Sequence, residues 1–210
     1  YGTKGTASPA NVPGGRYGST SCVDPDGRVW VHGGYGAGAT STGLLNDLWK
    51  WDGTNWTWAS GSDTPNQPGV YGTKGLAAAA NVPGARENST SWSDASGSLW
   101  LLGGWGIPSA GSEDALNDLW KWDGTNWTWM KGADTAGQTG VYGTKGLPGP
   151  ANEPGARYGS VAGKDPSGAV KVFGGVRLSS AYDSYLLNDL WRWDGSEWTW
   201  LSGSNGAGEA

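Results

Sequence analysis

The sequence is poor in the residues from which catalytic and metal sites are usually built. It has one cysteine, one histidine, one phenylalanine and one methionine among 210 residues. The single Cys22 excludes an intrachain disulfide and any zinc site made of several cysteines. The single His32 excludes any centre that needs two imidazoles, and we expect it to be a core residue with one satisfied hydrogen bond. We therefore predict no catalytic residue, no metal and no cofactor.

The chain also lacks a basic surface and long apolar runs. Lys and Arg total 14 against 19 Asp and Glu, which gives a net charge of −5. Binding to nucleic acid or to an anionic membrane requires clustered positive charge, so neither partner is expected. No apolar run approaches the roughly 18 residues of a membrane-spanning helix. No segment has the apolar period of an amphipathic helix, so we expect essentially no helix.

Glycine and tryptophan are the residues that are abundant. The chain contains 39 Gly and 16 Trp. A glycine-rich chain without aromatic residues would be expected to be disordered. Each indole, however, can bury on the order of 200 Å². The composition therefore predicts a folded protein whose apolar area is concentrated in a few large rings.

The chain repeats itself three times. The segment Tyr-Gly-Thr-Lys-Gly begins at Tyr1, Tyr71 and Tyr142, and the segment Asn-Asp-Leu-Trp begins at Asn46, Asn117 and Asn188. A fixed period of this size indicates one structural unit that is copied and stacked, because a single unit cannot bury its own apolar faces. We predict three units, 1–70, 71–141 and 142–210, in one continuous array. The way the sequence begins and stops within the period suggests a piece of a longer array.

Within a unit, short apolar runs alternate with turn residues. In the first copy, Asp24-Pro25-Asp26-Gly27 predicts a tight turn, and residues 29–32 predict a buried strand that ends in a glycine pair. A variable segment of 11 or 12 residues follows, and residues 47–52 and 56–58 predict two further strands around a second hairpin turn. With the short strand before the first turn, this makes a four-stranded antiparallel unit of the kind found in propeller blades. About 20 residues, between Ser60 and Gly84, then lead to the next unit, and we expect them to pack over one face of a neighbouring blade.

Three motifs, in the same order in each copy, resemble those of the Kelch-repeat β-propeller family. They are the glycine pairs at 33–34, 103–104 and 174–175, the aromatic pairs at 49 and 56, 120 and 127, and 191 and 198, and the Pro-Gly-small-Arg segments at 13–16, 83–86 and 154–157. Two departures are visible: the unit is longer than the usual Kelch unit of about 50 residues, and Ser19, Ser89 and Ser160 stand where the family commonly has His. The long form resembles secreted bacterial Kelch arrays. The resemblance implies an all-β propeller in an extracellular or cell-surface setting.

Three blades are too few to close a propeller, which needs about four to eight. The chain is then a fragment of a larger ring, or two copies complete a six-bladed ring by an isologous twofold arrangement, or copies join head to tail in a fibre. Galactose oxidase, the family's best known enzyme, holds copper with Tyr and His side chains and has a Cys–Tyr crosslink. With one His and one Cys, this chain is not expected to share that activity.

Some polar residues recur in every copy. Arg16, Arg86 and Arg157 share one position, and so do Asp47, Asp118 and Asp189. Repetition favours a structural role for both sets, with the arginines bonded to strand ends and the aspartates capping the third strand. For the arginines, a ring of guanidinium groups that grips an anion is the functional alternative.

Residues that do not recur are better candidates for ligand binding, because loops on a rigid scaffold carry function. The candidates in the variable segments are Tyr35, Trp105, Ile107, Arg177, Tyr182 and Tyr185. Exposed aromatic rings among them would suit the faces of sugars. Asn55, Asn88 and Asn126 match the glycan acceptor pattern, although two of these matches overlap the turn and strand signature.

The sequence therefore predicts a non-enzymatic, extracellular binding or scaffold propeller that presents variable loops to a protein or a glycan. Two alternatives remain open. The chain could be part of a larger propeller enzyme, an oxidase or a carbohydrate-active enzyme, whose active site lies on other blades. It could also be a self-assembling structural subunit.

Overall fold

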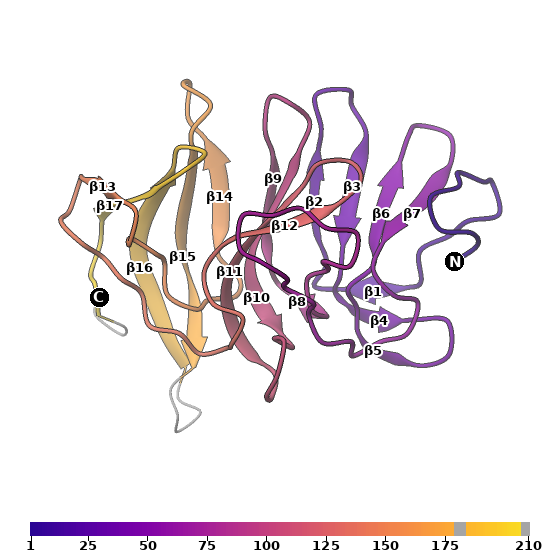
Figure 1. The fold of residues 1–210 in the computed structure, drawn as a ribbon, viewed down its shortest axis with the longest axis horizontal. Helices are drawn as coiled ribbons and strands as arrows, with labels where there is room; N and C mark the ends of the chain where they lie inside the picture. Colours follow the sequence, from indigo (N-terminus) through magenta and orange to yellow (C-terminus); the bar gives the residue numbers. More distant parts are fainter. Residues whose placement is uncertain (179–183, 207–210) are drawn as a thin grey trace.

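A computed structural model describes residues 1–178 and 184–206 of the chain. All regular structure in these residues is β, and no helix is present in them, as the absence of helical periodicity predicted. It follows that the described part contains no helix long and apolar enough to cross a membrane. Figure 1 shows the three repeats as neighbouring groups of strands along the long axis, with the two ends of the chain at opposite sides.

The strands of the three repeats correspond closely. The first repeat contains β1 (Arg16–Tyr17), β2 (Thr20–Val23), β3 (Val29–His32), β4 (Tyr35–Ala37), β5 (Thr42–Leu44), β6 (Leu48–Trp51) and β7 (Trp56–Ser60). The second contains β8 (Arg86–Glu87), β9 (Thr90–Ser93), β10 (Leu99–Gly106), β11 (Asp114–Trp122) and β12 (Trp127–Lys131). The third contains β13 (Pro148–Gly149), β14 (Val161–Lys164), β15 (Val170–Leu178), β16 (Ser184–Trp193) and β17 (Trp198–Ser202).

Every repeat has the same sheet order, and all named strands pair antiparallel. The first sheet runs β2-β3-β6-β7, the second runs β9-β10-β11-β12, and the third runs β14-β15-β16-β17 with β13 added at its outer edge. The predicted turn from Asp24 to Gly27 is present, because the Gly27 N–H donates to the Asp24 carbonyl at 2.9 Å. The Asp24 carboxylate also accepts from the Trp30 indole N–H at 2.9 Å, which fixes the turn against its sheet.

The strand before the glycine pair ends at His32 in the first repeat, as the sequence predicted, but not in the other two. In the second and third repeats β10 and β15 continue past the pair, through a shift in pairing register at Gly104 and Gly175. Both glycines have positive φ, 106° and 107°, which a side-chain-bearing residue adopts at a cost. The pair therefore makes a bulge that redirects the strand. As a result, the segment predicted to be a variable loop is a β-hairpin, formed by the ends of β10 and β11 in the second repeat and by β4 and β5 in the first.

The long connection between repeats covers the outer edge of the sheet that follows it. Tyr71 packs against Trp120 and Trp129 of the second sheet, with ring centroids 4.8 and 5.1 Å apart. Ala78 forms a β-bridge to Trp127 on the outer strand β12. Tyr71 therefore lies over a sheet face, as the sequence predicted for this connection. The bridge at Ala78 also protects an edge strand that would otherwise offer unpaired backbone groups.

The sheets are joined by two clusters of buried apolar side chains. The cluster between the first and second sheets contains Trp30, Leu48, Tyr71, Leu99, Leu101, Trp120, Trp122 and Trp127. The cluster between the second and third contains Trp92, Trp100, Leu102, Leu119, Val170, Val172, Trp191, Trp193 and Trp198. The core is thus mostly indole, and it lies between repeats rather than within one repeat.

Candidate functional site

The hairpins that extend beyond the glycine pairs form an open groove. Two adjoining cavities, of about 610 and 460 Å³, lie on either side of the segment that connects β10 and β11, and both are lined by Gly111 and Glu113. We call the two cavities together the tip groove. Most of its residues come from the variable segments, where the repeats differ, and Asn66, Thr135 and Ala136 come from the connections between repeats.

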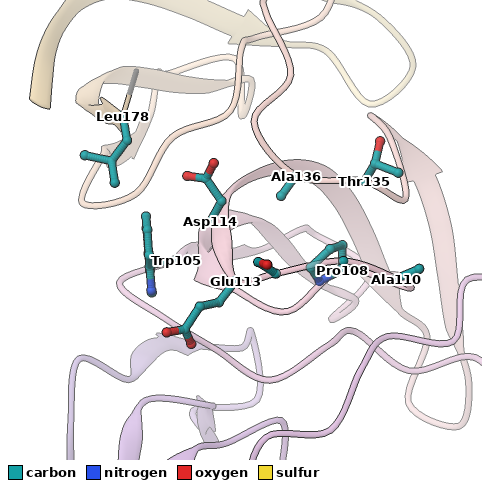
Figure 2. Close-up of a pocket in the computed structure, with 10 residues that line it drawn as sticks. Trp105, Pro108, Ala110, Glu113, Asp114, Thr135, Ala136 and Leu178 are labelled. Atoms are coloured by element: carbon teal, nitrogen blue, oxygen red, sulfur yellow. The ribbon is translucent and has the colours of Figure 1, made fainter. Parts of the chain in front are cut away.

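The larger cavity lies between the second and third repeats. Figure 2 shows Trp105 and Leu178 along one side and Pro108 on the other, with the carboxylates of Glu113 and Asp114 between them. Trp105 is half-buried. Its ring meets that of Tyr158, from the third repeat, edge to face with centroids 5.7 Å apart. An indole held in this way presents a rigid apolar surface beside two acceptor groups.

The smaller cavity lies between the first and second repeats. Tyr35, Leu44 and Asn66 line it from the first repeat, and Ile107 and Glu113 line it from the second. Asn66 holds the hairpin β4–β5 in place through two hydrogen bonds to Leu44. Its Oδ1 accepts from the Leu44 N–H at 2.9 Å, and its own backbone N–H donates to the Leu44 carbonyl at 2.7 Å. The structure therefore brings Tyr35 and Ile107 into one cavity and Trp105 into its neighbour.

Two further side chains extend the aromatic and acidic character of this region. Tyr17 is 64% exposed, and its ring lies 5.5 Å from that of Tyr35. Glu87 is the register partner of Trp105 on β8. Burial, together with the nearby charge of Glu113, raises the pKa of Glu87 above its ordinary value. Within the described residues its Oε2 is buried without a hydrogen-bond partner.

The remaining candidates from the variable segments lie elsewhere. Arg177 and Tyr185 are register partners on β15 and β16. Arg177 lines a separate cavity of about 70 Å³ with Tyr142 and Arg157. Tyr182 lies outside the described residues.

The repeated arginines are buried in ion pairs. Arg86 donates to both carboxylate oxygens of Asp118 at 2.7 Å, and both residues are almost inaccessible, 1% and 0% exposed. The same carboxylate accepts from the Tyr71 hydroxyl at 2.6 Å and from the Trp120 indole N–H at 2.8 Å. Arg16 pairs in the same way with Asp47. We call the arrangement of one arginine, one aspartate, one tyrosine and one tryptophan in each repeat the Arg–Asp network.

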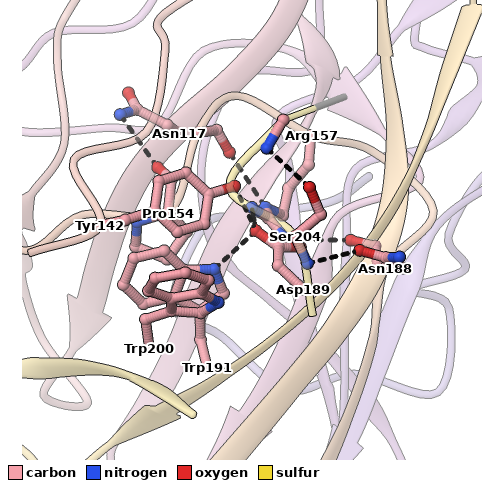
Figure 3. A network of polar contacts seen from close by, with 12 residues as sticks. Asn117, Tyr142, Pro154, Arg157, Asn188, Asp189, Trp191, Trp200 and Ser204 are labelled. Atoms are coloured by element: carbon pink, nitrogen blue, oxygen red, sulfur yellow. Dashed lines mark hydrogen bonds and ion pairs between the residues drawn. The ribbon is translucent and has the colours of Figure 1, made fainter. Parts of the chain in front are cut away.

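Figure 3 shows the third copy of the network, in which Arg157, Tyr142 and Trp191 converge on Asp189. Burial by itself would raise the pKa of Asp189, but the hydrogen bonds and positive charge of Arg157 outweigh it and hold the pKa below its ordinary value. The same balance lowers the pKa of Asp47. With their charge neutralised inside each repeat, the arginines fit the structural role better than the anion-binding one.

The three possible glycan acceptors occupy turns. Asn55 and Asn126 are half-buried in the second hairpin turns, where their backbone N–H groups donate to Asp52 and Asp123. Asn88 is exposed, with φ of 53°. Asn88 is thus the acceptor position that solvent reaches most freely.

The single histidine and the single cysteine of the chain lie away from the groove. His32 is buried between the first and second sheets, with its ring 5.8 Å from that of Trp127. Contrary to expectation, neither imidazole nitrogen has a hydrogen-bond partner among the described residues. Burial raises the pKa of the Cys22 thiol to about 11, so the thiolate is scarce at neutral pH. Among the described residues, no group of three or more His, Cys, Asp or Glu side chains is arranged to hold a metal ion.

Sequence reasoning missed three groove residues. Glu113 and Asp114 are adjacent acids in a variable segment, and this was the signal available for them. Asn66 has φ of 61°, and the corresponding residue of the next repeat is Gly137, with φ of 72°. Asn in one repeat and Gly at the same position of the next indicate a left-handed backbone conformation. This pattern was the signal from which a turn at position 66 could have been predicted.

No family model matches the chain, and no curated protein sequence matches it. Among solved structures it is similar to that of YjhT, with a TM-score of 0.53 and 18% identity over 95% of this chain and 54% of that one. It also resembles a protein of unknown function from Dyadobacter fermentans, with a TM-score of 0.47 and 10% identity over 88% of this chain and 53% of that one. A third is a fungal alcohol oxidase of the AA5 family in complex with copper, with a TM-score of 0.38 and 14% identity over 90% of this chain and 44% of that one.

These comparisons bear on the fold. The likeness to YjhT and the several antiparallel sheets fit the Kelch-like or propeller-like fold that the repeat motifs predict. The chain spans about half the length of each of these three structures.

Substitution Asp118→Asn tests the Arg–Asp network. We expect it to lower the free energy of unfolding by about 3–5 kcal/mol, because it leaves the Arg86 guanidinium buried without its counter-charge. Tyr71→Phe removes one hydrogen bond from the same carboxylate and should cost about 1 kcal/mol. Urea unfolding followed by circular dichroism measures both. Equal, small losses for the two variants would contradict the assignment.

Substitution His32→Leu tests the buried imidazole; Leu is the residue at the corresponding position of the next repeat, Leu102. Burial lowers the pKa of His32 from 6.5 to about 3, with a smaller contribution from the positive charge of Arg86. Between these values the unfolded chain binds a proton that the native state does not, so His32 makes the protein less stable as the pH falls below about 6.5. Leu does not titrate, so the variant lacks this loss. As the pH is lowered from 7 to 4, the free energy of unfolding of the variant minus that of the parent should increase by about 3 kcal/mol. Thermal unfolding across that range measures it, and a difference independent of pH would show that the imidazole does not titrate as described.

Proposed function

We propose that this chain is a non-enzymatic binding scaffold of propeller-like fold whose tip groove binds a glycan. The observation that carries the proposal is the convergence of Tyr35, Trp105 and Ile107, three non-repeating apolar residues, on two adjoining cavities that share Glu113. The frame beneath them repeats almost unchanged, whereas the groove residues differ from copy to copy. A constant frame with variable groove residues is expected of a rigid scaffold that presents a recognition surface.

The chemistry of the groove favours a sugar over other small ligands. The rings of Tyr35 and Trp105 offer flat apolar surfaces for the C–H faces of a pyranose. The carboxylates of Glu113 and Asp114, together with the Asn66 amide, can accept hydrogen bonds from hydroxyl groups. The acidic side chains disfavour an anionic ligand, so a neutral oligosaccharide is the class of ligand that fits best.

Binding is proposed rather than catalysis because the groove offers apolar rings and carboxylates but neither the histidine nor the cysteine of the chain. His32 is buried with a strongly lowered pKa, and the pKa of the Cys22 thiol is raised. The guanidinium groups of the repeated arginines are neutralised in the Arg–Asp network. For the setting we propose the cell surface or the extracellular space, on the resemblance of the long repeat to secreted Kelch arrays.

Substitution Trp105→Ala tests the proposal. A printed array of neutral oligosaccharides would first identify ligands, and isothermal titration calorimetry would then compare the parent chain with the variant. We expect the loss of this anchor to weaken binding at least tenfold, that is by about 1.4 kcal/mol or more. Leu76→Ala is the matched control, because Leu76 is 61% exposed and lies outside the groove; it should bind as the parent does.

Three outcomes would count against the proposal. The array could show no binding, the Trp105 and Leu76 variants could bind equally, or the bound oligosaccharide could be cleaved or oxidised on incubation. The last result would favour the alternative that this chain is part of a propeller enzyme. Capture of a protein through the same groove, without glycan binding, would favour the protein-ligand alternative.

A further inference from the structure

The contact between the first and second sheets, here called the first contact, leaves a cavity of about 600 Å³ beside the outer strands β7 and β12. We call it the rim cavity, and it shares no lining residue with the tip groove. Ser60 lines it from β7, Val82 from the connection between the repeats, and Asn126 from the second hairpin turn of the second repeat. The rim cavity is therefore made where two neighbouring repeats meet inside the array.

At the second contact, between the second and third sheets, the equivalent space is bridged by two long side chains. Ser60 corresponds to Lys131, whose ammonium group donates to a carbonyl of the following connection at 2.8 Å. Val82 corresponds to Glu153, whose carboxylate accepts from the N–H of Gly132 at 3.2 Å. The shorter side chains of Ser60 and Val82 leave this space open at the first contact.

The backbone around these positions is the same at the two contacts. Val82 forms a β-bridge with Val70, and Glu153 forms the equivalent bridge with Val141. The N–H of Val70 donates to the carbonyl of Val82 at 2.9 Å, and the N–H of Val141 donates to that of Glu153 at 2.8 Å. The two contacts therefore differ here in their side chains, and a glutamate at position 82 would project from the same backbone position as Glu153.

At the second contact, both backbone polar groups of Gly132 are engaged. Its N–H donates to the Glu153 carboxylate, and its carbonyl accepts from the Lys74 ammonium group at 2.7 Å. At the first contact, the Lys4 ammonium group donates to the carbonyl of Gly61 in the same way, at 2.6 Å. No acceptor for the N–H of Gly61 is found among the described residues. Gly132 is buried and Gly61 is half-buried, so the first contact has the donors of a carboxylate site without the carboxylate.

The charge of the rim cavity is opposite to that of the tip groove. Among the described residues that line the rim cavity, Lys4 is the one charged residue, and none is Asp or Glu. Its ammonium group is held in place, because it is bonded to the Gly61 carbonyl and lies 4.5 Å from the centre of the Trp58 ring. The tip groove, in contrast, is lined by Glu113 and Asp114. The two cavities therefore favour ligands of different charge.

We propose that the rim cavity binds a small aliphatic carboxylate, whose carboxylate group takes the position that the Glu153 side chain takes at the second contact. The N–H of Gly61 donates to this group, and the Lys4 ammonium group supplies the opposite charge. The ligand thus completes at the first contact an interaction that the chain makes for itself at the second. Because the ammonium group lies near the surface, the expected affinity is modest.

The aliphatic part of the ligand follows from the side chain that the first contact lacks. Lys131 has a four-carbon stem at the second contact. At the first contact, Ala59, Ala79 and Val82 are among the residues that line the cavity. A short hydrocarbon chain covers this apolar surface as a lysine stem does, and the volume is within the range of small-ligand sites. A free acid of about six carbons and the C-terminal end of a peptide both carry this chemistry.

Titration with hexanoate, followed by the amide signal of Gly61 in heteronuclear NMR spectra, tests the proposal. We expect a saturable shift of this signal at concentrations up to about 10 mM. Hexanamide has the same body without the charge, so it should bind at least about tenfold more weakly. A short alanine peptide with a free C-terminus, compared with its amidated form, distinguishes the two sources. Tighter binding of the free peptide than of hexanoate identifies a peptide end, and the reverse identifies a free acid.

Three single variants locate the site. Val82→Glu supplies the carboxylate from the chain itself, as Glu153 does at the second contact, and should weaken hexanoate binding at least about tenfold while circular dichroism shows an intact fold. Lys4→Gln removes the positive charge and should also weaken binding. Leu76→Glu is the matched control, because it adds the same negative charge at a residue that is 61% exposed and lies outside the cavity; it should bind as the parent does.

Three results would overturn the proposal. Hexanoate and hexanamide could bind equally, the Gly61 signal could show no saturable shift, or the Val82→Glu and Leu76→Glu variants could bind hexanoate equally. The test is independent of glycan binding, because the two cavities share no residue. Trp105→Ala should therefore leave hexanoate binding unchanged.

Discussion

The structure depends on a buried ion pair that is built once in every repeat. Arg86 and Asp118 are almost inaccessible to solvent, and in each copy the carboxylate also accepts hydrogen bonds from a tyrosine and a tryptophan. Removing two charges from water is costly, and only several well-formed hydrogen bonds offset that cost. The tyrosine comes from the connection before the sheet, the arginine precedes its inner strand, and the aspartate begins the repeated part of its third strand. The network therefore fixes the connection, the bulge and the strands of one repeat relative to one another.

This constraint explains why the repeats differ where they do. The network and the indoles of the sheet contacts cannot change without leaving a buried charge or a void. The hairpins beyond the glycine pairs are buried at their bases, at residues such as Leu44 and Leu116, but their tips line open cavities. They vary in length and in side chain while the bulge at Gly104 and Gly175 keeps their direction. A rigid frame that carries variable hairpin tips suits a binding surface. Because the frame and the tips are different residues, the repeated motifs of the frame say little about function.

The sequence predicted the strands, the turns and the buried tryptophans because these follow from local patterns that occur three times. It did not predict that β10 and β11 extend beyond the glycine pair, because two adjacent glycines are equally typical of a loop and of a bulge. The contact of Tyr71 with Asp118 joins residues 47 apart, and no local pattern contains it. Among the groove residues, Tyr35, Trp105 and Ile107 were candidates because they do not repeat. Local signals were present for Glu113 and Asn66, but only the neighbouring repeat that completes their cavity connects these signals with a groove.

Each cavity of the tip groove is made by two repeats. Leu178, from the third repeat, completes the cavity of Trp105, and Ile107, from the second, completes that of Tyr35. Neither cavity would exist in an isolated repeat, since the sheet contacts set the distance between neighbouring tips. The packing between sheets therefore determines the shape of the groove as well as the stability of the array. Any contact that adds a sheet at either end of the array brings another pair of variable tips together, so the number of cavities grows with the number of contacts between repeats.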